Sequence, residues 1–287
     1  MRIAVVFLCL LPSCAQDFSG LRVERVSAGH RFTEGPVWSP EGYLLFSDVP
    51  NNRILKFVPG KGTETFRENS NGANGNAIDR QGRLYTCESR TRRLVRSGAK
   101  GEPAVLAERW QGKRLNAPND VVVRRDGHIW FTDPAFGNQA DTRELDFYGV
   151  YHIPPKGPME LSARPGGRPN GIALSPDGRI LYVANSDEKN IRAYDIDRQG
   201  GASNERVLIS NIDGVPDGIR TDEKGNLYVT AKGVAIYSPQ GKLLHTIELP
   251  ETPANCAFGD PDLQTLYVTA RTSVYRVRLN VKGSVQY

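Results

Sequence analysis

The feature of this 287-residue chain that most restricts its fold is a segment that recurs six times. Each copy is a polar turn followed by a short apolar run, as in SPDG followed by RILYV at residues 175–183. The turns recur every 38–51 residues and end at the following positions: Gly42, Gly82, Gly127, Gly178, Gly225 and Leu263. A period of about forty residues that holds several short strands is typical of a β-propeller blade.

One period can be divided into four strands. In the second repeat we predict strands at residues 74–78, 83–88, 92–96 and 103–108, separated by polar or glycine-containing turns. Beyond the N-terminal segment, no stretch combines helical periodicity with caps. The sequence therefore predicts an all-β protein, a six-bladed β-propeller with four-stranded blades.

The two ends of the repeat array indicate how the ring closes. The last repeat offers only three strands, and residues 21–27 alternate between apolar and polar without a blade of their own. We predict that this N-terminal strand completes the sixth blade, which would pair two otherwise open sheet edges.

The N-terminus has the pattern of an export signal. Met1-Arg2 precedes an apolar run of nine residues, and Ser13 and Ala15 suit a cleavage before Gln16. We therefore predict a signal peptide at residues 1–15, a single propeller domain at residues 16–287, and a periplasmic or secreted location. The alternative is a lipid anchor on Cys14. The apolar run is too short to cross a bilayer.

Composition and short motifs narrow the classes of function that this chain can have. The net charge is +5, but the basic residues occur in scattered pairs, so no nucleic-acid partner is predicted. After cleavage, Cys87 and Cys256 remain in separate repeats, which favours two buried free thiols over a disulfide. His152 is expected to be structural, and no Gly-x-Ser-x-Gly or phosphate-binding glycine loop occurs.

One polar position recurs in every repeat. Eight residues before each turn marker the chain carries Glu34, Asn74, Asn119, Asn170, Asp217 and Asn255. This offset falls at the start of the innermost strand, so the six side chains should form a ring at one mouth of the central channel. Carboxylate and amide oxygens suit a hard cation, foremost Ca²⁺. The alternative is that the Asn-Gly and Asp-Gly pairs only make turns.

Two further features remain open. A second series at the end of the next strand includes Asp48, Glu88, Asp133 and Asn185, which are either functional groups or ordinary strand-end residues. Residues 134–147 lengthen the third repeat, and this segment is either a loop that covers a substrate or a passive insertion.

The motifs together resemble the senescence marker protein (regucalcin) and gluconolactonase family, closest to its bacterial gluconolactonase-like members. The resemblance spans nearly all of residues 21–280. It rests on TEGPVWS at residues 33–39, LNAPNDV at 115–121, FTDP at 131–134, RPNGIALSPDG at 168–178 and VPDGI at 215–219.

This resemblance implies a divalent-metal lactonase that acts on a small sugar lactone. It implies metal ligands at Glu34, Asn119, Asn170 and Asp217, with Ca²⁺ as the first candidate and Zn²⁺, Mg²⁺ or Mn²⁺ as alternatives. Asp217 would act on water or attack the substrate itself, and Asn74, Asn255 and Asp133 would contact the substrate. The alternatives are hydrolysis of other lactones or of organophosphate triesters, or a secreted propeller that binds without turnover.

Overall fold

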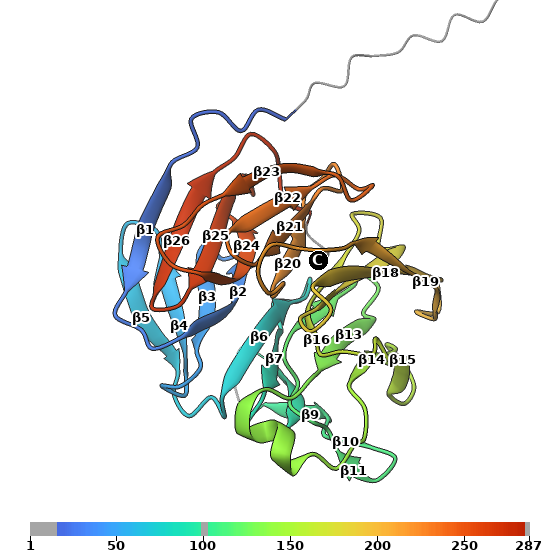
Figure 1. Ribbon diagram of the computed structural model, residues 1–287. Coiled ribbons are helices and arrows are strands. Elements are labelled where there is room, and N and C mark those ends of the chain that lie inside the picture. Colours follow the sequence, from blue (N-terminus) through green and yellow to red (C-terminus); the bar gives the residue numbers. More distant parts are fainter. Residues whose placement is uncertain (1–15, 99–102, 285–287) are drawn as a thin grey trace, which may run out of the picture.

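Six four-stranded antiparallel sheets surround a central axis in the computed structural model, which describes residues 16–98 and 103–284 (Figure 1). Successive segments of the chain form neighbouring blades, and each blade is a meander from an inner strand to an outer one. This arrangement confirms the predicted six-bladed propeller.

The first three blades use residues 33–163. Blade 1 contains β2 (Thr33–Ser39), β3 (Tyr43–Asp48), β4 (Arg53–Val58) and β5 (Gly62–Arg67). Blade 2 contains β6 (Ala73–Ile78), β7 (Leu84–Glu88), β8 (Arg93–Ser97) and β9 (Ala104–Ala107). Blade 3 contains β12 (Val121–Val123), β13 (Ile129–Asp133), β14 (Gly149–Ile153) and β15 (Glu160–Ala163).

The last three blades include the N-terminal strand. Blade 4 contains β16 (Pro169–Leu174), β17 (Ile180–Asn185), β18 (Asn190–Ile196) and β19 (Ala202–Ile209). Blade 5 contains β20 (Ile219–Thr221), β21 (Leu227–Thr230), β22 (Val234–Tyr237) and β23 (Leu243–Ile247). Blade 6 contains β24 (Pro253–Gly259), β25 (Thr265–Ala270), β26 (Ser273–Arg278) and β1 (Val23–Ala28).

The predicted strands of the second repeat agree with β6 to β9 to within two residues at each boundary. The closing strand is also confirmed: β1 pairs antiparallel with β26, from Val23 opposite Val277 to Ala28 opposite Ser273. Outside the blades lie a short hairpin, β10 (Arg109–Trp110) with β11 (Lys113–Arg114), and one 3-10 helix, η1 (Gly137–Thr142). No helix in the described part of the chain is long and apolar enough to cross a membrane.

The hydrophobic core is divided among the blade interfaces. Six clusters of buried apolar side chains occur in the described residues, and each lies mainly between two neighbouring blades. Between blades 5 and 6, for example, Tyr228 and Val268 pack with Val277. Cys87 and Cys256 are buried free thiols, as predicted. Because each blade buries one face against each neighbour, the ring holds the inner strands in fixed positions.

A buried histidine pair lies in blade 3, away from the ring. His152 Nε2 is 2.7 Å from His128 Nδ1, and His152 Nδ1 is 3.3 Å from Glu160. The rings stack with each other and with Trp130, and burial lowers the pKa of both imidazoles. These contacts fit the structural role expected for His152.

Candidate metal and lactone site

The six recurring polar residues lie at the same end of the six inner strands. Hydrogen bonds join neighbouring blades at this end of the propeller, all the way around the ring. Gly75 N donates to Asn119 O, Gly171 N donates to Asp217 O, and Gly218 N donates to Ala254 O. Ser47 Oγ donates to Asn74 O, Thr132 Oγ1 donates to Asn170 O, and Asn255 Nδ2 donates to Glu34 Oε2. These contacts link all six blades in order, so the structure brings the predicted ring together.

The glycines that follow four ring residues have a packing role. A Cβ atom on Gly35 would lie 1.9 Å from Asn74 O, and one on Gly171 would lie 2.1 Å from Asp217 O. Gly75 and Gly218 face similar contacts with the next blade. Of the four, only Gly35 has a positive φ, at 50°. The glycines therefore allow neighbouring inner strands to approach closely, which corrects the alternative that they only make turns.

Two buried carboxylates at this mouth, those of Glu34 and Asp217, lie close enough to influence each other electrostatically. Burial, together with the nearby charge of Asp120, raises the pKa of Glu34 to about 7. Burial and the charge of Glu34 raise the pKa of Asp217 well above its usual value. The two groups thus cannot easily carry charge together unless a cation lies between them. That property fits a site whose resident group is a divalent cation.

Amide oxygens complete the donor set. Asn170 Nδ2 donates to Ser186 Oγ at 3.1 Å, which leaves the buried Oδ1 of Asn170 without a hydrogen-bond partner. A buried carbonyl oxygen without a donor is costly, and a cation would satisfy it. Asn119 is 8% exposed at the same mouth. No group of three His, Cys, Asp or Glu side chains in metal-binding geometry occurs in the described residues, and the predicted set contains only two such side chains.

Asn74 and Asn255, the two ring residues predicted to contact the substrate rather than the metal, are called the wall residues here. They differ in their hydrogen bonds. Asn74 Oδ1 is buried and has no partner, so it remains available to another group. Asn255 uses both ends of its amide, because Oδ1 accepts from Cys256 N at 2.9 Å while Nδ2 donates to Glu34. The geometry of Asn255 favours a role in orienting Glu34.

Sequence reasoning missed an ion pair beneath the ring. Asp120 is fully buried, and its carboxylate accepts from Val121 N at 2.9 Å and from Ile172 N at 3.3 Å. Arg220 Nη1 lies 3.5 Å from the same carboxylate. Both residues were overlooked because the repeat count selects one position per blade. The Asn-Asp pair at residues 119–120 was the available signal.

Asp133 holds a loop at this end of the propeller. Its two carboxylate oxygens accept from Asn116 N and Ala117 N, each at 2.8 Å, and the residue is fully buried. Burial raises its pKa to about 7. The equivalent Asp48 and Glu88 bind arginines and nearby polar groups. This geometry favours a role for Asp133 in positioning the loop that leads to Asn119, rather than in contacting a substrate.

The insertion after β13 contains η1 and connects three blades. Gln139 Nε2 donates to Ser89 O of the β7–β8 turn at 3.0 Å, and Arg168, just before β16, lies over the ring of Phe136. Asn116 Nδ2 donates to Phe147 O at 3.0 Å, close to the ring. The insertion therefore lies against blades 2 and 4 at the end of the propeller that carries the ring.

The fold and this mouth define the class: a six-bladed β-propeller with a ring of buried carboxylate and amide side chains at one end of its channel. A family model described as "SMP-30/Gluconolactonase/LRE-like region" matches residues 32–272. The chain belongs to this family, whose gluconolactonase-like members are lactone hydrolases.

Three relatives show the extent of the similarity. The gluconolactonase of Zymomonas mobilis is 34% identical over 91% of this chain and 82% of its own length. The solved gluconolactonase of Xanthomonas campestris is 35% identical, with a TM-score of 0.85 over 91% of this chain and 90% of that one. A regucalcin from Agrobacterium tumefaciens, described as calcium-binding, is 20% identical with a TM-score of 0.76, covering 91% of this chain and 95% of that one.

Proposed function

We propose that this protein hydrolyses a sugar lactone with the help of one divalent cation, most readily Ca²⁺. The observation that carries the proposal is the pair of buried carboxylates, Glu34 and Asp217, with raised pKa values beside the unpaired oxygen of Asn170. The family's lactone hydrolases supply the reaction class.

The cation would be held by Glu34, Asn119, Asn170 and Asp217. Two carboxylates balance its charge, and two amide oxygens add ligands of the hard type that Ca²⁺ prefers. When bound, the cation supplies Lewis acidity to a carbonyl oxygen and stabilises developing negative charge there. Asp120 and Arg220 form an ion pair beneath the ring, in which the positive charge of Arg220 opposes the effect of Asp120 on Glu34.

Asp217 is the residue that would act on the reacting atoms. It would either take a proton from the attacking water or attack the lactone carbonyl carbon itself through its carboxylate. In both routes the ring C–O bond breaks, the ring oxygen gains a proton and one water is consumed. Asn74 would hydrogen-bond a substrate hydroxyl through its unpaired amide oxygen.

A substrate panel with and without metal tests this proposal. We expect hydrolysis of glucono-δ-lactone to disappear after chelation and to return with added Ca²⁺. The same preparation should act more slowly on an unsubstituted aliphatic lactone and on a phosphotriester. Full activity in the chelated protein would contradict the metal role. Faster turnover of the phosphotriester would replace the lactonase assignment, and metal binding without turnover of any compound would favour a binding protein.

We also propose that the protein is exported, because of the charged start, apolar run and small residues at positions 1–15, which lie outside the described residues. In the fold, Gln16 Nε2 donates to Tyr228 Oη at 3.0 Å, so residue 16 already packs on blade 5. Intact-mass measurement on protein recovered from the expressing cells should give a chain that begins near Gln16, or a lipid on Cys14. A cytoplasmic chain that retains Met1 would contradict export.

A further inference from the structure

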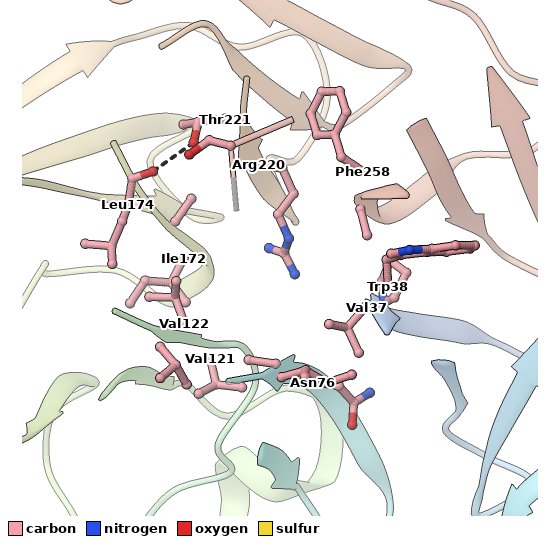
Figure 2. A pocket seen from close by; sticks show the side chains of 17 residues that line it. Val37, Trp38, Asn76, Val121, Val122, Ile172, Leu174, Arg220, Thr221 and Phe258 are labelled. Atoms are coloured by element: carbon pink, nitrogen blue, oxygen red, sulfur yellow. Dashed lines mark hydrogen bonds between the residues drawn. The ribbon is translucent and has the colours of Figure 1, made fainter. Parts of the chain in front are cut away.

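The central channel continues beyond the ring into a second chamber of different character. The inner strands that place polar residues at the ring mouth place apolar residues two to four positions later. Val37, Val122, Ile172, Leu174 and Phe258 line this chamber (Figure 2). The cavity has a volume of about 100 Å³. Apolar cavities of roughly 150 Å³ hold a molecule the size of benzene, so this smaller chamber suits an unbranched aliphatic chain, of which a few carbon atoms would lie fully inside.

One cation points into this apolar chamber. Arg220 extends from β20 toward the centre of the cavity, with its guanidinium between the side chains of the other inner strands (Figure 2). Its side chain is 20% exposed. A guanidinium in such surroundings requires hydrogen-bond acceptors, because its N–H groups have left much of the solvent.

The bonds of Arg220 leave one edge of the guanidinium free. Nη1 donates to Ile219 O at 2.6 Å and lies 3.5 Å from Asp120 Oδ2. In the described residues, neither Nε nor Nη2 has a hydrogen-bond partner. These two nitrogens form the edge that binds both oxygens of a carboxylate in parallel.

We propose that this chamber binds a small organic monocarboxylate with a short aliphatic body. Its carboxylate would lie on Nε and Nη2 of Arg220, and its alkyl chain would lie against Val37, Val122 and Ile172. The long single contact to Asp120 leaves Arg220 able to bridge two carboxylates. This site is separate from the ring, because none of the six ring residues lines the chamber.

Ligand-observed NMR on the full chain with acetate, butyrate and hexanoate tests the proposal. We expect saturable binding of hexanoate with a dissociation constant in roughly the millimolar range or below. Affinity should rise about fourfold for each added methylene until the chamber is full. Hexanol, which keeps the alkyl chain but lacks the charge, should bind at least about tenfold more weakly.

Metal removal and variants locate the site. Hexanoate binding should persist after chelation, which distinguishes it from coordination to a cation at the ring and makes it independent of the proposed activity. Arg220→Met should weaken hexanoate binding at least about tenfold, while Arg206→Met, on the exposed outer strand of blade 4, should not. Because Arg220→Met leaves Asp120 unpaired and could unfold the chain, Val122→Phe provides a second variant. It fills the chamber, and Val105→Phe on an exposed outer strand is its control.

Three results would each overturn the proposal. The first is the absence of saturable hexanoate binding up to about 50 mM, far above the expected constant. The second is equal binding of hexanoate by a folded Arg220→Met or Val122→Phe variant and its control. The third is a gain of more than about tenfold when residues 285–287 are deleted, because the natural occupant would then be the chain's own end.

Discussion

The Asp217→Asn variant is expected to bind Ca²⁺ more weakly and to hydrolyse lactone about 10²–10⁴ times more slowly than the unaltered protein. The substitution keeps the size of the side chain. It removes one of the two carboxylates that would face the cation, and with it the proposed base or nucleophile. Calorimetric metal titration and lactone kinetics at saturating metal separate the two losses, since only the binding loss is rescued by excess Ca²⁺.

Asn74→Ala is the matched comparison at the same mouth. Asn74 is a ring residue without a proposed metal contact, so the metal affinity of the Asn74→Ala variant should stay nearly unchanged. Its lactone kinetics should change by up to about 1–3 kcal/mol, the cost of losing a buried hydrogen bond. If metal affinity fell as far in Asn74→Ala as in Asp217→Asn, the division of the ring into ligands and wall residues would be wrong.

We also predict how the stability of the metal-free Asp217→Asn variant, relative to the unaltered protein, depends on pH. Burial and Glu34 raise the pKa of Asp217 in the folded state above the ordinary value of 3.8. A carboxyl group with a raised folded pKa costs the folded state stability as pH rises above 3.8, because the unfolded chain loses its proton first. In chelator at pH 8, Asp217→Asn should therefore resist urea better than the unaltered protein, and this advantage should vanish near pH 3.8. An advantage that does not depend on pH would contradict the electrostatic account.

Gly35→Ala is expected to produce the second large effect, a loss of about 2–5 kcal/mol in the free energy of unfolding. The added Cβ would lie 1.9 Å from Asn74 O, so blades 1 and 2 must separate, which is an overpacking cost of roughly 1–3 kcal/mol or more. The positive φ of Gly35 adds about 1–2 kcal/mol. Urea unfolding of the chelated protein measures the loss. The displaced Glu34 should lower metal affinity as well.

Gly137→Ala isolates the backbone contribution. Gly137 has a φ of 54°, nearly that of Gly35, but no atom lies within 4 Å of its added Cβ. Its loss should stay near 1–2 kcal/mol. Equal losses in the two variants would show that the contact between inner strands is not what requires Gly35.

The sequence predicted the blades well because their signal is repeated. Six copies of one turn-and-strand pattern fixed the period, and the shared offset of Glu34, Asn170 and Asp217 fixed their depth along the inner strands. The unpaired residues 21–27 likewise indicated the closing strand, now seen as β1. Periodicity carries such information because equivalent positions are related by rotation about the axis.

Features that occur once could not be found in this way. Asp120 and Arg220 meet only because blades 3 and 5 both face the channel, and no repeat relates them. The role of Gly171 depends on the distance to Asp217 O in the next blade, which no local pattern contains. Asp133 occupies the same position in its blade as Asp48 and Glu88 do in theirs. Its hydrogen bonds to Asn116 N and Ala117 N, however, depend on a loop that the other blades do not repeat.

The pairing of β1 with β26 affects the order in which the protein can mature. Val23 and Val277 pair with each other although they lie near opposite ends of the described chain. Blade 6 therefore cannot form until its last strand has been synthesised. The contact between Asn255 and Glu34 spans the same junction. Blades 1 to 5 can assemble from sequence neighbours, whereas the ring of six polar residues becomes whole only in the final closing step. Incomplete chains would therefore lack the finished ring of polar residues, and any activity that depends on the ring would appear only when the fold is complete.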